Sequence, residues 1–419
     1  MMKTFCLLIF VFMLSIGCNA QIKVPYQIIE SFETVFNRQD TKRKELWKSK
    51  DFRKAIVVMQ DLHSRYQQLD SLEKVKYIGN IQGLFYNLSC AYSLIHQIDS
   101  SIMYLQNTVD LGPSNYNWLK KDPDLDNIRK DKRYQAIVDK LKETYDYEFI
   151  LKRNGSYKKE SGFLPSVNYQ AKGASELTAL RIKYHLDAIA GNGSEVSRFI
   201  NLMSWVHQTV RHDGNSSNPS DRHADAMIEL CKKENRGVNC RMLATILNEV
   251  YLSMGYQSHF VTCLPKDKND NDCHVINSVF SHTLNKWLWM DPSFDTWVKD
   301  DKGNFLGIEE VRERLVNNLP VFASPTINWN GKPYSGGGDE YLHSYMAKNL
   351  FQVQIPSISC SAFESRTSME SLVLQNPKPM EKFYIQLIPS EFKHENVALG
   401  KIVNGVYYTN DSEQFWKKP

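Results

Sequence analysis

Three residues in the second half of the chain could together perform acyl transfer with a cysteine nucleophile. Cys240 ends the segment Gly237-Val238-Asn239-Cys240 and directly precedes an amphipathic run, residues 241–250. His274 and Asp291 follow, each in a strand-like segment. A cysteine at a helix start, then a histidine, then a carboxylate is the order that such a site requires. We predict Cys240 as nucleophile, His274 as general base and Asp291 as the carboxylate that orients the imidazole.

The position of Cys240 should favour its thiolate, which is the form that attacks a carbonyl carbon. Asn239 is a good N-cap residue, so Cys240 should be the first helical residue, where unpaired N–H groups and the helix dipole favour an anion. An imidazolium beside the sulfur would lower the thiol pKa further. Gly237 lets the chain turn tightly into the helix. The same helix N-terminus could donate N–H groups to the oxyanion of an attacked carbonyl.

A hairpin should bring the histidine and the carboxylate together. His274 and Asp291 are symmetric about position 282.5, which lies at a turn predicted over 282–285. Facing residues of an antiparallel pair have a nearly constant sum of residue numbers. We therefore expect the two side chains to face each other to within about one residue of register.

Other polar residues in this half are assigned structural roles. His207 and Arg211 share a helix face, and His212 and Asp213 end that helix, so we interpret the four as a structural network. The acidic loop 267–272 lacks the glycine and the final glutamate of a calcium loop, which favours a solvated hairpin loop.

The cysteines do not form a metal-binding pattern. Cys263, Cys273 and His274 lack the paired spacing of a zinc site. Cys263 and Cys273 flank a polar loop, so a disulfide across that hairpin is one alternative and two buried free thiols are the other. No metal and no organic cofactor is predicted.

The first part of the chain, residues 24–148, has the periodicity of helices. Apolar residues recur at spacings of three and four: Phe52, Ala55, Ile56, Met59, Leu62, Tyr66 and Leu69. A second set alternates large and small residues: Phe85, Leu88, Ser89, Tyr92, Ser101, Leu105 and Thr108. This second set resembles a tetratricopeptide repeat. An unrelated helical bundle is the alternative, and neither carries a chemical motif.

The second part of the chain changes from helical to strand periodicity after Gly255, which we predict to cap the Cys240 helix. Helices are expected before it and strands after it: helices over 175–189, 196–210, 224–231 and 240–254; strands over 256–263, 274–280 and 287–291. A helix near 308–315 follows. The last hundred residues look loop-rich, with short strands such as 350–355 and 383–388.

The first twenty residues have the pattern of an export signal: Lys3, then an apolar run over 5–14. Cys18 and Ala20 would suit cleavage before Gln21. Alternatively, residues 16–18 resemble a bacterial lipobox, which would leave a lipid on Cys18. No later segment is apolar enough to span a membrane.

The length of the chain is sufficient for two or three domains, and its composition does not by itself indicate a functional class. The chain has 419 residues, 42% of them apolar, and a net charge of +4. Neither nucleic-acid binding nor attachment to a membrane surface follows from so small a charge. Eight cysteines are too few for a disulfide scaffold of this length.

The segment from about Trp205 to Phe294 resembles the transglutaminase-like superfamily of papain-like cysteine enzymes. Residues 237–244 are similar to its nucleophile helix, residues 273–277 to its histidine strand, and residues 286–292 (Lys-Trp-Leu-Trp-Met-Asp-Pro) to its aspartate strand. The resemblance implies a helix packed on an antiparallel sheet, with Cys240, His274 and Asp291 as the triad. The superfamily includes cross-linkers, peptidases, amidases and inactive binding members, so membership leaves the reaction open.

The predicted architecture is α+β. It comprises a signal peptide (1–20), a helical, tetratricopeptide-like domain (24–148), and a transglutaminase-like domain with a loop-rich C-terminal extension (157–419). We expect an exported bacterial enzyme, periplasmic or anchored by a lipid on Cys18. It would attack a peptide or protein amide through a thioester, with hydrolysis favoured over cross-linking. The alternative is a catalytically silent scaffold that binds a protein or peptide together with the helical domain, which could bind a protein partner.

Overall fold

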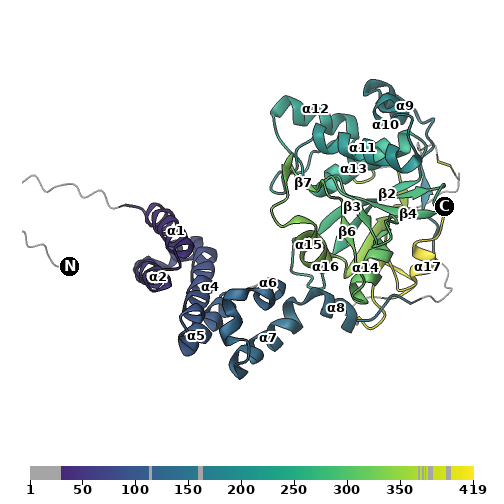
Figure 1. Ribbon diagram of the computed structural model, residues 1–419. Helices are drawn as coiled ribbons and strands as arrows, with labels where there is room; N and C mark the ends of the chain where they lie inside the picture. Colours follow the sequence, from purple (N-terminus) through teal and green to yellow (C-terminus); the bar gives the residue numbers. More distant parts are fainter. Residues whose placement is uncertain are drawn as a thin grey trace, which may run out of the picture. The chain divides into compact units, whose positions relative to one another are not determined.

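The computed structural model describes residues 30–112, 116–158, 164–366, 369, 372, 374–375, 381–392 and 398–419. The predicted signal segment, with both of its cleavage alternatives, lies outside these residues. The described chain divides into two compact units (Figure 1). Unit 1 comprises residues 30–112 and 124–128, and unit 2 comprises residues 116–123 and the described residues from 129 to 419.

Unit 1 is entirely helical, as the periodicity of this region predicted. Its elements are α1 (Phe32–Lys48), α2 (Phe52–Gln67), α3 (Ser71–Lys76), α4 (Ile78–Leu94), α5 (Ile98–Asp110) and all but the first residue of the 3₁₀ helix η1 (Pro123–Ile128). The N-termini of α1, α2 and α3 are capped by the side chains of Ser31, Asp51 and Asp70. The apolar faces of α1, α2, α4 and α5 share one core.

Two serines let helices α4 and α5 pack closely. The Ser89 hydroxyl donates to the Ser101 carbonyl at 2.9 Å, and the Ser101 hydroxyl donates to the Ser89 carbonyl at 2.8 Å. Tyr92 and Tyr104 stack beside them with ring centroids 5.5 Å apart. The large and small residues in the predicted repeat pattern are therefore contacts of one helical hairpin.

Unit 2 is built on a seven-stranded sheet in the order β12-β13-β11-β9-β2-β3-β4. Its strands are β2 (Ser258–Leu264), β3 (His274–Ser281), β4 (Lys286–Met290), β9 (Gln352–Pro356), β11 (Tyr384–Leu387), β12 (Ile402–Val403) and β13 (Val406–Thr409). All neighbours are antiparallel except β11 and β13, which are parallel. The predicted antiparallel sheet is thus present, with one parallel pair, β11 and β13, inside the edge strand β12.

Helices cover both faces of this sheet (Figure 1). One face packs on α9 (Ser175–Lys183), α10 (Leu186–Ala190), α11 (Glu195–Thr209), α12 (Ala224–Glu234) and α13 (Cys240–Ser253). The other face packs on α8 (Tyr147–Arg153), α14 (Ile308–Val316), the π-helix η2 (Tyr341–Met346) and α16 (Ala347–Asn349). Because side chains alternate between faces along a strand, Val279 and Leu288 contact the α13 layer, whereas Ile276 and Trp289 contact the opposite layer.

The remaining elements of unit 2 are short or lie outside these layers. They are α6 (Tyr116–Lys121), α7 (Lys132–Tyr145), β1 (Asn168–Tyr169), β5 (Val298–Lys299), β6 (Phe322–Ala323), β7 (Asn328–Trp329), β8 (Lys332–Pro333), α15 (Gly337–Glu340), β10 (Ile358–Ser359) and α17 (Ser412–Phe415). Small two-stranded sheets join β1 with β10, β5 with β6 and β7 with β8.

The sequence patterns located most elements of unit 2 but did not predict that the C-terminal region contributes strands to the main sheet. The helix predicted from Cys240 is α13, and Gly255 follows it with a φ of +89°, as expected of a helix-ending glycine. The segments predicted as strands near 350–355 and 383–388 are β9 and β11. The tail that looked loop-rich therefore supplies four strands of the main sheet, because β9 pairs with β2.

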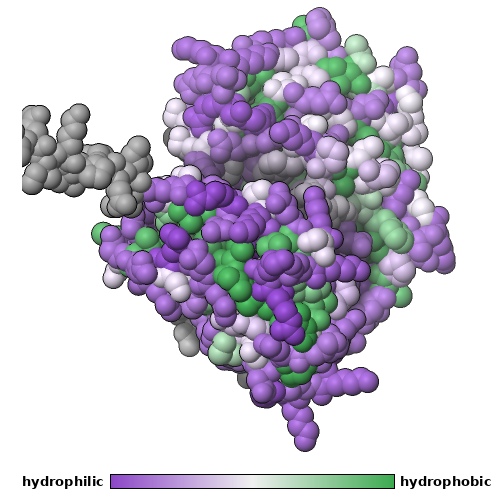
Figure 2. Space-filling view, turned by 60° about the vertical axis from the view of Figure 1, so that its left-hand side comes forward, coloured by the Kyte–Doolittle hydropathy of each residue, from purple (hydrophilic) through white to green (hydrophobic). Residues whose placement is uncertain are grey.

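The surface has no unusual apolar feature on the face in view. Figure 2 shows hydrophilic residues over most of that face with hydrophobic residues scattered among them, which is ordinary for folded proteins. Among the described helices, none combines the length and the apolar character that crossing a membrane requires.

Candidate active site

Cys240 is the first residue of α13, as the N-cap pattern predicted. The Asn239 side chain accepts a hydrogen bond from the Met242 N–H at 3.1 Å, which is the geometry of an N-cap. The thiol is partly open to solvent, yet protein atoms surround most of it. A thiolate here would benefit from the partial positive charge of the helix N-terminus.

The segment that leads into α13 is held by a parallel bridge to residues 211–213. The Val238 N–H donates to the Arg211 carbonyl at 3.0 Å, and the Asp213 N–H donates to the Val238 carbonyl at 2.8 Å. Gly237 lies so close that an added Cβ would be 2.5 Å from the Arg211 carbonyl oxygen. This glycine is therefore required by close backbone contact rather than by a left-handed turn.

His274 and Asp291 form a buried hydrogen-bonded pair. His274 Nε2 lies 2.7 Å from Asp291 Oδ2, and the two side chains are 1% and 0% exposed. Asp291 also accepts from the Tyr341 hydroxyl at 2.6 Å and from the Ser293 N–H at 2.8 Å. The carboxylate is thus fixed on both oxygens, so it can hold the imidazole in one orientation.

The hairpin brings this pair together with a shifted register. The turn spans 282–285, as predicted, but Asn277 faces Met290 and Ser278 faces Trp289. The position of Asp291 is therefore opposite Ile276 rather than opposite His274. A shift of two residues keeps both side chains on the same face of the sheet, and the diagonal distance is within reach of an imidazole.

The second ring nitrogen of His274 is left for the thiol. Nδ1 is buried and makes no hydrogen bond of normal geometry. Cys240 lies close enough for His274 to act on its ionisation, and the Val275 N–H also points to the sulfur. The thiol–imidazole contact is therefore looser than the His274–Asp291 contact, which is common before a substrate binds.

The ionisation of the site favours a thiolate–imidazolium pair. Burial by itself would raise the pKa of Cys240, but His212, His274 and the Val275 N–H outweigh it and lower that pKa to about 6. Burial would lower the pKa of His274, but the charge and hydrogen bond of Asp291 outweigh it and raise that pKa to about 10. At neutral pH the sulfur is then ionised and the imidazole is protonated.

His212 is a site residue that the sequence assigned to a structural network. It interacts with the Cys240 thiol, and its ring packs on Trp329 with centroids 4.3 Å apart. Its backbone is fixed by Asn330, whose amide group pairs with the His212 N–H at 2.7 Å and the His212 carbonyl at 3.0 Å. Its Nδ1 is buried and has no hydrogen-bond partner among the described residues. The thiol therefore lies near two imidazoles.

His207, from the same predicted network, does have the structural role. Its ring nitrogens pair with the Pro292 carbonyl at 2.9 Å and with Asn328 Oδ1 at 2.6 Å. These contacts fix the chain immediately after Asp291. Sequence spacing does not show which of His207 and His212 reaches the thiol. That depends on the bridge between residues 211–213 and the segment before Cys240.

Aromatic rings enclose the histidine pair. Tyr345 and Phe294 pack on the His274 ring with centroids 5.2 and 5.7 Å away. Phe294 also contacts Trp329 at 4.8 Å, and Trp329 is the ring that supports His212. This wall limits water around the charged groups, which strengthens their interaction. Tyr341 and Tyr345 lie on the π-helix η2, which the sequence did not indicate.

Cys263, Cys273 and the acidic loop 267–272 are the other groups in this half of the chain whose roles the sequence left open. Cys263 and Cys273 are free thiols, so the disulfide alternative is not realised. Asp270 and Asp272 pair with Lys348 at 2.9 and 2.8 Å. These ion pairs attach the loop to α16.

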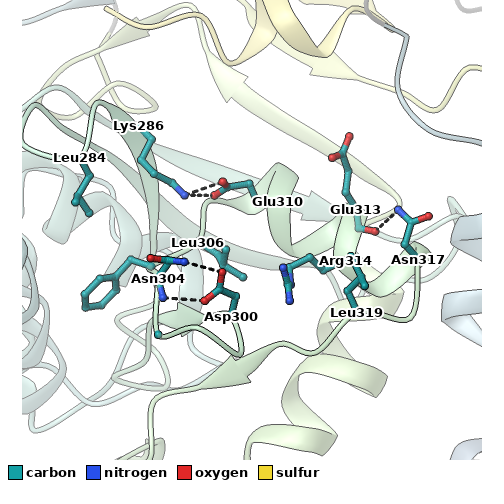
Figure 3. Close-up of a pocket in the computed structure, with 12 residues that line it drawn as sticks. Leu284, Lys286, Asp300, Asn304, Leu306, Glu310, Glu313, Arg314, Asn317 and Leu319 are labelled. Carbon is teal, nitrogen blue, oxygen red and sulfur yellow. Dashed lines mark hydrogen bonds and ion pairs between the residues drawn. The ribbon is translucent and has the colours of Figure 1, made fainter.

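A separate hollow of about 620 Å³ lies between the β4 hairpin and α14 (Figure 3). Lys286 pairs there with Glu310 at 2.6 Å and Arg314 pairs with Asp301 at 2.6 Å, and the Asp300 carboxylate accepts hydrogen bonds from Asn304. None of the three predicted catalytic residues lines it. The hollow therefore offers binding space without a reactive group.

A family model covers the three residues of this site. Residues 183–292 match the model of the transglutaminase-like superfamily. A search of curated proteins gave no match. One solved structure, provisionally described as a cysteine protease from Cytophaga hutchinsonii, matches with 13% identity and a TM-score of 0.23, over 37% of this chain and half the length of that chain. The segment 183–292, which contains Cys240, His274 and Asp291, is thus a transglutaminase-like superfamily segment of unit 2.

Proposed function

We propose that the protein is a cysteine acyl-transfer enzyme that attacks an amide through Cys240. The observation that carries this proposal is the connected set of three groups: a thiol at the N-terminus of α13, the free Nδ1 of His274 beside it, and Asp291 on the other nitrogen at 2.7 Å. A merely structural cysteine would need neither a buried imidazole nor a buried carboxylate behind it.

The reaction would proceed in two steps. The Cys240 thiolate attacks the amide carbonyl carbon, and the developing oxyanion is met by N–H groups at the start of α13. The C–N bond then breaks, and the imidazolium of His274 gives its proton to the departing amine. A thioester remains on Cys240. In the second step His274 takes a proton from the incoming nucleophile, which attacks the thioester and releases the acid or the new amide.

We infer that water is the favoured acceptor. Water needs no dedicated site, whereas an amine acceptor must be bound and aligned near the thioester. A peptide or protein amide is the proposed substrate class, and the helical unit 1 could bind a protein partner. Export through the segment 1–20, followed by a periplasmic or Cys18-anchored location, belongs to the same proposal. The mass of the mature N-terminus in native cells tests it, because an intact Met1 would contradict export.

Trapping of the acyl-enzyme tests the proposed reaction. The full chain is incubated with a library of peptide amides, quenched in acid and examined by intact-protein mass spectrometry. We expect an added acyl mass on Cys240 that hydroxylamine removes, as it does for thioesters. The matched Cys240→Ser variant should carry no hydroxylamine-labile mass. The catalytically silent scaffold would be the correct interpretation if two results were obtained together: no acyl mass on the wild-type protein, and a Cys240 thiol no more reactive than a free cysteine near pH 6.5.

A further inference from the structure

A second cavity, distinct from the active site, lies on the face of the sheet opposite α13. It has a volume of about 320 Å³, within the range of small-ligand sites. Segments from three parts of unit 2 line it: residues 164–169, strands β2, β4, β9 and β11, and the chain after α17. None of the catalytic residues described above is among the lining residues.

His259 is the exceptional residue of this cavity. It lies on β2, is only 2% exposed, and lines the cavity, yet neither of its ring nitrogens has a hydrogen-bond partner in the described region. An imidazole in this condition is destabilising, because both its donor and its acceptor have lost water without replacement. An apolar side chain of the same size would avoid that penalty, and a polar group bound in the cavity would offset it.

Aromatic rings surround the His259 imidazole. The centroids of Trp287, Trp416 and Tyr169 lie 4.7, 6.4 and 6.5 Å from the imidazole centroid. Trp287 and Tyr169 line the cavity themselves, together with Phe415 and Ile385. These flat apolar walls favour a planar guest.

Two further polar groups around His259 lack partners. Ser278 is the cross-strand partner of His259 on β3, so both side chains point to the same face. The Ser278 hydroxyl and the Trp416 indole N–H are both buried and have no hydrogen-bond partner within the part of the chain that the structure describes. Three neighbouring side chains thus have polar atoms without hydrogen-bond partners. A single misplaced side chain would leave only its own atoms without partners.

The charge of the cavity favours a neutral guest. Burial lowers the pKa of His259 to about 3, so the ring is uncharged at neutral pH. The lysines at the rim, Lys417 and Lys418, are exposed and face water rather than the buried part. A carboxylate placed beside His259 would therefore lose hydration without gaining a buried cation.

We propose that this cavity binds a small, uncharged aromatic compound whose amide or hydroxyl group hydrogen-bonds to His259. The aromatic ring of the guest stacks among Trp287 and Tyr169, and its polar group uses the donor or the acceptor of the neutral imidazole. This site is independent of the acyl-transfer chemistry proposed for Cys240.

Benzamide is a suitable probe because it joins a ring to a neutral amide. The full chain is titrated with benzamide, with benzoate, and with toluene, and binding is followed by ligand-observed NMR. We expect benzamide to bind more tightly than the other two. His259→Phe keeps the aromatic volume and should weaken benzamide binding by about tenfold, the size of one buried hydrogen bond, without weakening toluene binding. The matched His63→Phe variant in unit 1 should bind benzamide as the wild type does.

Two further measurements keep the proposal falsifiable if His259→Phe does not fold. Val167→Trp adds volume to a lining residue other than the imidazole and should abolish benzamide binding. A crystal structure with benzamide should place the amide at His259. Tighter binding of benzoate than of benzamide would refute the proposal that the ligand is uncharged. Absence of benzamide binding, with ordered water on both nitrogens of His259, would show a solvated cavity and overturn the proposal.

Discussion

His274 and Asp291 are 2.7 Å apart at their side chains although the hairpin does not pair their backbones. Ile276 occupies the position opposite Asp291, so the histidine reaches the carboxylate diagonally along the same face. The Tyr341 hydroxyl and the Ser293 N–H hold the carboxylate from the other side. Orientation of His274 therefore depends on residues outside the hairpin as well as on the hairpin itself.

The three catalytic substitutions should differ in severity. Cys240→Ala and His274→Ala should each abolish turnover, because the nucleophile and the proton carrier act as one unit. Asp291→Ala should be roughly a hundredfold less severe, since it removes only orientation and charge. Initial rates with the trapped peptide measure this order, and circular dichroism checks the fold. Wild-type turnover by Cys240→Ala would refute the assigned nucleophile.

Alkylation of Cys240 should begin well below the pH at which ordinary thiols react. Its rate with iodoacetamide should rise with a midpoint near pH 6, because the thiol pKa is about 6. Turnover should also decrease as the pH rises through about 10, because His274 then loses the proton that the leaving amine needs. Cys273, whose pKa is raised mainly by burial, is the internal comparison. A Cys240 midpoint near 8.5 would contradict the ion pair.

His212→Phe should raise the thiol pKa and slow alkylation at pH 6.5. The substitution keeps an aromatic ring against Trp329 but removes the imidazole that lowers the pKa of the Cys240 thiol. A change of about one pH unit in the midpoint corresponds to ~1.4 kcal/mol of lost thiolate stabilisation. The matched control is His282→Phe in the hairpin turn, which should leave the midpoint unchanged. Equal profiles for wild type and His212→Phe would restore the purely structural interpretation of His212.

Glu249 should make the protein less stable as the pH rises. It lies buried on α13 and accepts the Ala224 and Ala362 N–H groups at 3.0 and 2.8 Å. Burial raises its pKa from 4.5 to about 7. The folded state then binds more protons between those values, so the free energy of unfolding falls by roughly 3 kcal/mol as the pH rises through this window.

Urea unfolding between pH 4 and 8 measures this contribution. Glu249→Gln should remove the fall in stability that is attributable to this carboxyl group. Glu234→Gln, on the exposed end of α12, is the control and should follow the wild-type curve. Parallel curves for wild type and Glu249→Gln would show that the carboxyl has an ordinary pKa in the folded protein.

Helix α8 should contribute to the stability of the catalytic unit. Ile150 and Leu151 are buried in the core on the α14 side of the sheet, and the Gly155 carbonyl accepts from Arg312 at 3.2 Å. A fragment of residues 157–419 loses these contacts, whereas 146–419 retains them. Deleting two buried aliphatic residues should lower the melting temperature by several degrees. Coincident melting curves for the two fragments would place the boundary after α8.

The sequence alone determined the local elements around the nucleophile. Asn239 before an amphipathic run predicted the start of α13, because a short polar side chain at that position satisfies an unpaired N–H. Alternating apolar residues with a polar turn predicted β3 and β4. The observed pairing differs from the predicted pairing by two residues, and a shift by an even number leaves His274 and Asp291 on the same face of the sheet. These properties depend on neighbours in the chain, which a sequence pattern records directly.

Tertiary structure alone decided the rest of the site. His212 reaches the thiol only because residues 211–213 run beside Val238, and Tyr341 reaches Asp291 from fifty residues further along the chain. The C-terminal strands join the sheet because β9 pairs with β2, although their own patterns are too short to predict a partner. Contacts between distant segments depend on which surfaces bury each other, and periodicity within one segment contains no information about its partner.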